Sequence, residues 1–150
     1  MQKSKEPIRH KVILDTSCLV AALLAEKGIS AQTFASAVQG EIYNFYTSEM
    51  LEELRDVLAR PKFELEKENQ EKFINLFQEV SFLIQQHASY LVVQCRDQKD
   101  DKFLSLANQI DANFIITLDA DLLVLGSIKR TKIIMPWEFL ERMKETNRRI

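Results

Sequence analysis

Hydrophobic residues along this chain follow two alternating patterns. Short runs rich in β-branched and aromatic residues predict buried strands, and longer stretches with apolar residues every three or four positions predict helices. The predicted strands are residues 12–14, 42–46, 90–93, 114–117 and 132–135. The predicted helices are residues 19–25, 30–40, 48–61, 64–86 and 99–110, then a helical turn at 122–125 and a closing helix from Pro136.

Alternating strands and helices predict an α/β fold, with a central, mostly parallel sheet of four to five strands and helices on both faces. A chain of 150 residues with 46% hydrophobic content is expected to form one domain over 1–150, with loosely ordered tails at 1–9 and 146–150. In such sheets, ligands bind at the carboxyl ends of the strands. Residues that bind a ligand or take part in catalysis are therefore expected at that edge of the sheet.

Net charge, the N-terminal pattern and cysteine usage bear on which partners and which cellular compartment the protein is expected to have. A net charge of −2 and a pI near 5.8 exclude a protein that coats nucleic acid by bulk electrostatics, although they allow a local basic patch. Basic residues before the apolar stretch 12–25 resemble a signal peptide, but Asp15, Thr16 and Ser17 interrupt it. Two cysteines without paired or metal-ligand spacing favour reduced thiols, so we expect a cytoplasmic protein without a membrane span.

Acidic residues occur where the predicted strands end. Asp15 directly follows the first strand, and Asp119 lies two residues after the fourth. Asp100 and Asp101 begin the helix that follows the third strand, where the helix dipole favours a carboxylate. Asp101 precedes Leu104 by one turn, which predicts that Asp101 lies near the buried face while Asp100 faces outward.

Glu53 is the least expected of these acids, because it shares a helix face with the core residues Met50 and Val57. A carboxylate on such a face is costly unless a cation pairs with it, and the sequence shows no obvious buried lysine or arginine. Several converging carboxylates repel one another by several kcal/mol. One or two Mg²⁺ or Mn²⁺ ions, which prefer oxygen ligands, would remove this repulsion.

Structural roles also account for some of these acids individually. Asp15 and Asp119 suit turns or helix caps, and Asp101 suits a helix N-terminus. Neither role applies to Glu53 in the middle of a helix. The combination therefore favours a metal site over four separate caps.

Four stretches occur in order along the chain: VILDTSCLVAALL, TSEMLEELRDVLARPKF, DQKDDKFLSLA and FIITLDADLLVL. A closing stretch, IIMPWEFLERM, extends the pattern over nearly the whole chain. In this order they resemble the PIN domain, a nuclease fold that includes the VapC-type toxins of bacterial toxin–antitoxin systems. The resemblance implies a Rossmann-like three-layer α/β/α fold and metal-dependent hydrolysis of phosphodiesters, most often in RNA.

The resemblance also implies roles for particular residues. The acids that would hold the metal and act in catalysis are Asp15, Glu53, Asp101 and Asp119, with Glu53 acting through water or orienting the nucleophile. The auxiliary candidates are Asp121, Ser17, Thr117 and Asp100, of which Ser17 and Thr117 would hold carboxylates by hydrogen bonds. Many relatives carry asparagine at the position of Ser17, whose hydroxyl reaches less far.

An RNA substrate on an acidic protein needs local positive charge. The candidate phosphate contacts are Lys99, Lys102, Lys129, Arg130 and Lys132, which are equally well explained as solvated surface charges. The resemblance further implies a protein antitoxin as partner and a homodimer.

Three other functions fit parts of the sequence. A non-catalytic PIN-fold module that binds RNA or protein would not need all four acids. A housekeeping RNA-processing or structure-specific nuclease would share the chemistry but not the toxin role. An aspartyl phosphotransferase using Asp15 usually carries a second acid two residues later, where this chain has Ser17.

Overall fold

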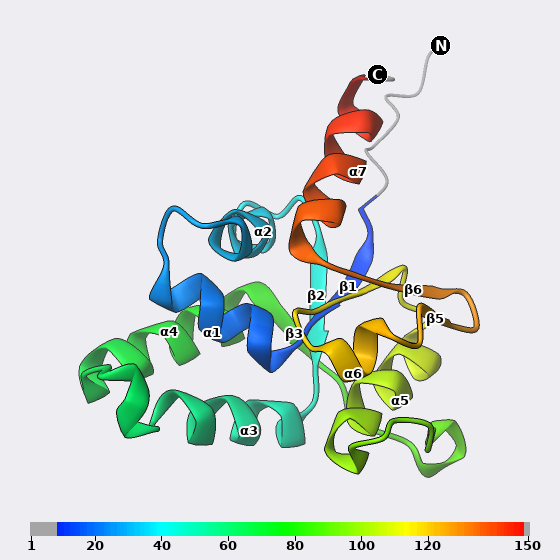
Figure 1. Ribbon diagram of the computed structural model, residues 1–150, viewed down its shortest axis with the longest axis horizontal. Helices are drawn as coiled ribbons and strands as arrows, with labels where there is room; N and C mark the ends of the chain where they lie inside the picture. Colours follow the sequence, from blue (N-terminus) through cyan, green and yellow to red (C-terminus); the bar gives the residue numbers. More distant parts are fainter. Residues whose placement is uncertain (1–8, 149–150) are drawn as a thin grey trace.

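A computed structural model describes residues 9–148 (Figure 1). Within these residues, six strands form one sheet in the order β3-β2-β1-β4-β6-β5. All neighbouring strands are parallel except β5 and β6, which are antiparallel. The strands are β1 (Lys11–Leu14), β2 (Tyr43–Tyr46), β3 (Ser81–Leu83), β4 (Phe114–Ile116), β5 (Ser127–Ile128) and β6 (Thr131–Ile134).

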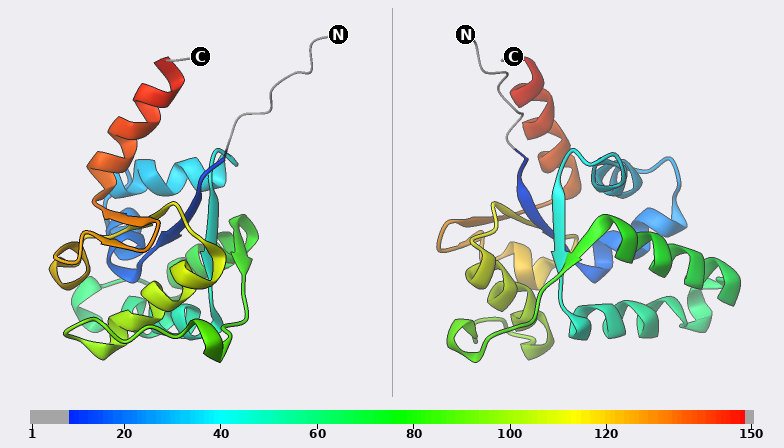
Figure 2. Two further views of the ribbon diagram at one scale, coloured as in Figure 1. Left: turned by 90° about the vertical axis from the view of Figure 1, so that its right-hand side faces the viewer. Right: turned by 180° about the vertical axis from the view of Figure 1, so that it is seen from behind.

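Helices cover both faces of this sheet. In Figure 1, α1 to α4 lie on one side and α5 lies on the other, and Figure 2 shows α7 extending from the body past α2. The α-helices are α1 (Thr16–Leu24), α2 (Ile29–Val38), α3 (Ser48–Leu58), α4 (Lys67–Val80), α5 (Asp101–Ile110), α6 (Ala120–Leu123) and α7 (Pro136–Arg148). Three short 3₁₀ helices are η1 (Pro61–Phe63), η2 (Ala88–Tyr90) and η3 (Gln98–Asp100). The predicted α/β class with a mostly parallel sheet is confirmed.

The two central strands, β1 and β4, form the middle of the core. Ile13, Leu14, Ile115 and Ile116 are almost completely buried, because helices cover both faces of the strands that carry them. Continuous apolar runs are typical of parallel strands buried on both faces. Among the described residues no single helix could cross a membrane; α1 and α2 reach the required length and apolarity only together, and they are bent by 103°.

The prediction of the third strand at residues 90–93 is wrong. That segment is irregular beyond η2 and is held to α5, where the Val92 N–H donates to the Ser105 hydroxyl at 2.9 Å. The third strand is β3, which follows α4 without a loop, and the Asn44 side chain on β2 donates to the Ser81 hydroxyl at 2.9 Å. Because no turn residue separates α4 from β3, helical spacing continued past the true helix end and predicted a helix up to residue 86.

The sheet has one strand more than the four to five expected. The additional strand, β5, is only two residues long, which is too short for a hydrophobic pattern to reveal. At the C-terminus, α7 includes residues 146–148, which belong to the tail expected from the sequence. Residues 1–8 and 149–150 of the predicted tails lie outside the described part of the chain.

Candidate metal centre

The strand order brings Asp15 and Asp119 together. β1 and β4 are neighbours in register, Leu14 beside Ile116, and the Asp15 N–H donates to the Ile116 carbonyl at 3.2 Å. Asp15 follows β1 directly, and Asp119 follows β4 by three residues and caps α6. Both carboxylates therefore lie at the carboxyl edge of the sheet, as the sequence predicts.

Three neighbours hold the Asp15 carboxylate. Its Oδ1 accepts from the Ser17 hydroxyl at 2.7 Å and from the Cys18 N–H at 3.0 Å, and its Oδ2 accepts from the Thr117 hydroxyl. The hydrogen bonds predicted for Ser17 and Thr117 are therefore present, and Asp15 is also the N-cap of α1. Burial raises the pKa of Asp15 and the charge of Asp119 raises it further, whereas these hydrogen bonds lower it. The net result is a pKa of about 6.

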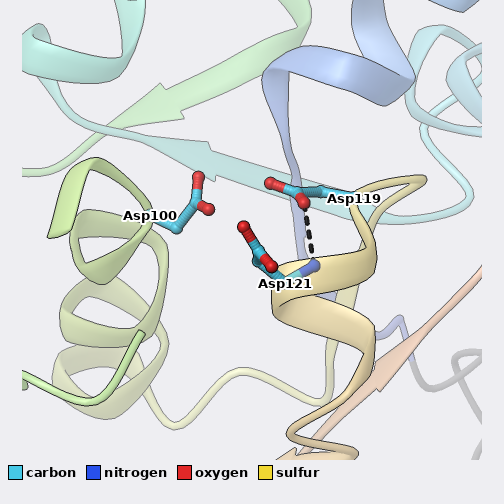
Figure 3. Close-up of side chains that lie close together, drawn as sticks. All are labelled: Asp100, Asp119 and Asp121. Carbon is cyan, nitrogen blue, oxygen red and sulfur yellow. Dashed lines mark hydrogen bonds between the residues drawn. The ribbon is translucent and has the colours of Figure 1, made fainter. Parts of the chain in front are cut away.

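Three carboxylates form the acidic cluster, which consists of Asp100, Asp119 and Asp121 (Figure 3). One carboxylate oxygen from each lies within 4.8 Å of the others. Asp100 comes from η3 ahead of α5, whereas Asp119 and Asp121 come from the start of α6, so segments far apart in the chain meet here. The Asp119 Oδ1 accepts from the Asp121 N–H at 2.9 Å, and the Asp119 N–H donates to the Thr117 hydroxyl at 2.9 Å.

The charges in this cluster are poorly compensated. Burial and the neighbouring carboxylates of Asp119 and Asp97 together raise the pKa of Asp100 to about 7, although the charge of Lys102 lowers it. A carboxylate with this pKa is only about half ionised at pH 7, and a bound cation would favour its ionised form. Three hard oxygen donors at this spacing fit a divalent ion such as Mg²⁺ or Mn²⁺.

Asp101, which the sequence predicts as the third acid, lies outside the acidic cluster. Its Oδ1 accepts from the backbone N–H groups of Cys95 at 2.7 Å and Gln94 at 2.9 Å. Burial raises the pKa of Asp101, but these two hydrogen bonds outweigh it and hold the pKa below its usual range. Asp101 lies on the buried face of α5, as the sequence predicts. Because it points inward, its carboxylate accepts hydrogen bonds from the loop before α5 and holds that loop in place. Asp100, expected to face outward, is the residue that reaches Asp119.

Glu53 has the buried cationic partner that the sequence did not reveal. Its Oε1 lies 2.9 Å from the Lys102 ammonium, whose side chain is 9% exposed, and its Oε2 accepts from the Thr16 hydroxyl. Lys102 also donates to the Lys99 carbonyl. Lys102 is therefore an internal partner of Glu53 and not an unengaged phosphate contact.

Replacing Lys102 with methionine is expected to lower the free energy of unfolding by about 1–2 kcal/mol, because it leaves the largely buried Glu53 without its cation. Lys72→Met is the matched control: its ion pair with Glu68 is 71% and 74% exposed, so the loss there should stay below about 0.5 kcal/mol. Urea unfolding measures both. Equal losses in the two variants would show that the Lys102 pair is no stronger than a surface pair.

A cleft of about 510 Å³ joins these groups, and its acidic end is lined by Asp15, Glu53, Asp97, Asp100 and Asp119. A neighbouring cavity of about 750 Å³ is larger, but the acids that line it are Glu49 and the already bonded Asp101. The smaller cleft is therefore the one whose chemistry suits a metal. The sheet edge thus brings together three of the four predicted acids, with Asp100 in place of the fourth.

The predicted basic residues divide between the two edges of the sheet. Lys99 is exposed and lines the cleft. Lys132 is level with Phe114 at the amino end of β6, and Lys129 and Arg130 form the turn before it, so these three lie at the opposite edge from the acidic cluster.

Arg96, which no sequence pattern singled out, lies beside the cluster. Its guanidinium is 3.3 Å from the Asp121 carboxylate, and its side chain is 87% exposed. Nothing in the spacing of the irregular segment before α5 could have revealed this contact, because it depends on how that segment folds back toward α6.

Comparison with known families matches residues 11–121 to the PIN domain. The chain belongs to the PIN domain family. The match begins at β1 and ends at Asp121, so it includes Asp15, Glu53 and the whole acidic cluster. This family is associated with metal-dependent nucleases, and the cluster of this PIN domain fits that chemistry.

A full-length relative is also found among curated proteins. MJ1680, an uncharacterized protein of Methanocaldococcus jannaschii, is 28% identical to this PIN domain over 151 residues. The alignment spans 93% of this chain and 96% of the relative. The similarity therefore extends over most of both chains and is not confined to the acids.

Proposed function

We propose that this PIN domain is a Mg²⁺- or Mn²⁺-dependent endoribonuclease that hydrolyses phosphodiester bonds. The observation that carries the proposal is the acidic cluster, in which three carboxylates converge within 4.8 Å at the carboxyl edge of a PIN fold. The cluster lies beside the cleft that also holds Asp15 and Glu53. Carboxylates brought together in this way repel one another, and a bound divalent ion would remove that repulsion.

Asp100, Asp119 and Asp121 would hold one or two metal ions, with Asp15 next to them. The bound ion would polarise the scissile phosphate and lower the pKa of a water molecule. Thr117 would keep both Asp15 and Asp119 in place, because its hydroxyl donates to the first and accepts from the backbone of the second. Glu53 would accept a hydrogen bond from the attacking water, and the Lys102 ammonium, 2.9 Å away, holds the Glu53 carboxylate in place. The expected products carry a 5′-phosphate and a 3′-hydroxyl.

The proposal is tested by incubating the purified protein with labelled single-stranded and structured RNA. Cleavage is expected with Mn²⁺ or Mg²⁺ and should stop in excess EDTA, and end-group analysis should find 5′-phosphates. Asp119→Asn, prepared identically, lacks one carboxylate of the acidic cluster and should be inactive. Cleavage that continues in EDTA or in the variant would exclude the metal mechanism, and an inactive wild-type protein would favour the non-catalytic module.

We also propose that the nuclease is the toxin of a toxin–antitoxin system, acting in the cytoplasm as a homodimer with a protein antitoxin as partner. The support is the likeness of the acidic motifs to VapC-type toxins. Induced expression should arrest growth, Asp119→Asn should not, and co-expression of the genomic neighbour should relieve the arrest. Growth that is indifferent to expression would favour a housekeeping nuclease.

A further inference from the structure

The cleft continues well beyond the acidic cluster. From Asp15 and Glu53 it follows α1 and α3, where apolar side chains including Ala21, Leu24 and Val57 form its walls. Arg60 and Phe63 also line it. A single cleft therefore combines carboxylates, an apolar section, an aromatic ring and a cationic residue.

The segment that carries Arg60 is a well-defined turn. Arg60 lies two residues after the end of α3 and immediately before η1, where the Phe63 N–H donates to the Arg60 carbonyl at 3.1 Å. The Lys62 ammonium lies 5.0 Å from the centre of the Phe63 ring. This turn is the ARPKF end of a sequence motif that the catalytic proposal leaves without a role.

Arg60 and Lys99 both line the cleft without an ion pair to a described residue, but Lys99 directly precedes Asp100 at the acidic end, whereas Arg60 lies beyond the apolar walls. Lys102 pairs with Glu53 and Arg96 pairs with Asp121, whereas Arg60 is exposed and forms no ion pair with any residue from 9 to 148. Glu53 and Arg60 are two helical turns apart, which is roughly 10 Å at 1.5 Å per residue. Arg60 is therefore positioned for an anion some distance from the acidic cluster.

We infer that Arg60 binds the RNA phosphate next to the scissile one, while the nucleoside between the two phosphates lies against the apolar walls and Phe63. This rests on the proposed nuclease function. A strand that repeats phosphate, nucleoside and phosphate matches the order of groups along the cleft. The arginine fork suits phosphate oxygens, and apolar or aromatic walls suit the faces of unpaired bases.

Arg60→Gln is expected to raise KM for a single-stranded RNA roughly tenfold and to change kcat less than twofold, because contact with a non-reacting phosphate is uniform binding. The slope of log(kcat/KM) against log[salt] should become shallower by about 0.7, the value for one lost phosphate contact on a single strand. Arg60→Lys should fall between wild type and Arg60→Gln, since it keeps the charge but loses the fork.

Arg55→Gln is the matched control, because Arg55 is an exposed arginine of α3 that does not line the cleft. It should leave KM and the salt slope near wild-type values. If the wild type cleaves RNA and the two glutamine variants behave alike, the Arg60 assignment is overturned while the nuclease function stands. If the wild type cleaves no RNA, the proposed function itself fails.

Discussion

Asp100→Asn is expected to lower Mn²⁺-dependent RNA cleavage by roughly 10³-fold, because removing one preorganised charge-stabilising group already costs 10²–10³ in rate. The same change should raise the thermal midpoint of the metal-free protein, since it removes the carboxylate whose pKa is raised to about 7 by burial and by its acidic neighbours. Cleavage assays in excess Mn²⁺ and thermal unfolding in EDTA measure the two effects.

Asp101→Asn is the adjacent control, and its expected behaviour is the reverse. The asparagine carbonyl still accepts the N–H groups of Gln94 and Cys95, but without charge assistance, so the free energy of unfolding should fall by about 1–2 kcal/mol. Cleavage should stay within roughly tenfold of wild type, because a fold of ordinary stability survives that loss. If Asp101→Asn is the inactive variant and Asp100→Asn the active one, the acidic cluster is not the metal site.

The fold was largely predictable because its central elements have strong patterns. The apolar run that follows Lys11 in β1, the apolar run of β4 and the spaced apolar residues of α3 and α5 leave little choice of structure. The edge strand β3 was not predictable, since two of its residues, Phe82 and Leu83, are exposed and continue the spacing of α4. Their strand conformation depends on pairing with β2, a contact over more than thirty residues of sequence.

The candidate site was predictable where topology alone fixes it. Asp15 and Asp119 follow neighbouring parallel strands, so their proximity comes from the fold class. Whether Asp100 or Asp101 joins the acidic cluster depends on which of the two carboxylates accepts the hydrogen bonds from the loop before α5. Helical spacing does not contain that information. The Glu53–Lys102 pair was missed for a similar reason: Lys102 adjoins an acidic stretch and has the appearance of a surface charge.

The unfolding free energy of the metal-free protein is expected to fall as pH rises, and Asp15 should account for much of the change. Burial raises the folded pKa of Asp15 to about 6 from its usual value of 3.8, so in this range the native state holds a proton that the unfolded state has released. The contribution is complete below pH 3.8 and is lost as pH rises through 6. A shift of about 2 units corresponds to about 3 kcal/mol, of which about 2 kcal/mol should be lost between pH 4.5 and 7.5.

Urea unfolding in EDTA of wild type and Asp15→Asn, at several pH values, isolates this contribution. Asp100 and His10 titrate in both proteins, so their effects cancel in the comparison. The raised pKa of Asp100 also lowers the unfolding free energy as pH rises. Burial lowers the pKa of His10, which has the opposite effect on the unfolding free energy. The difference between the two proteins should therefore grow by about 2 kcal/mol in favour of Asp15→Asn as pH rises. At pH 7.5, Mn²⁺ should stabilise the wild type much more than the variant, because only the wild type has the full set of carboxylates that a cation would neutralise. A pH-independent difference between the two proteins would mean that Asp15 is already ionised in the native state and that its hydrogen bonds from Ser17 and Thr117 compensate for its burial.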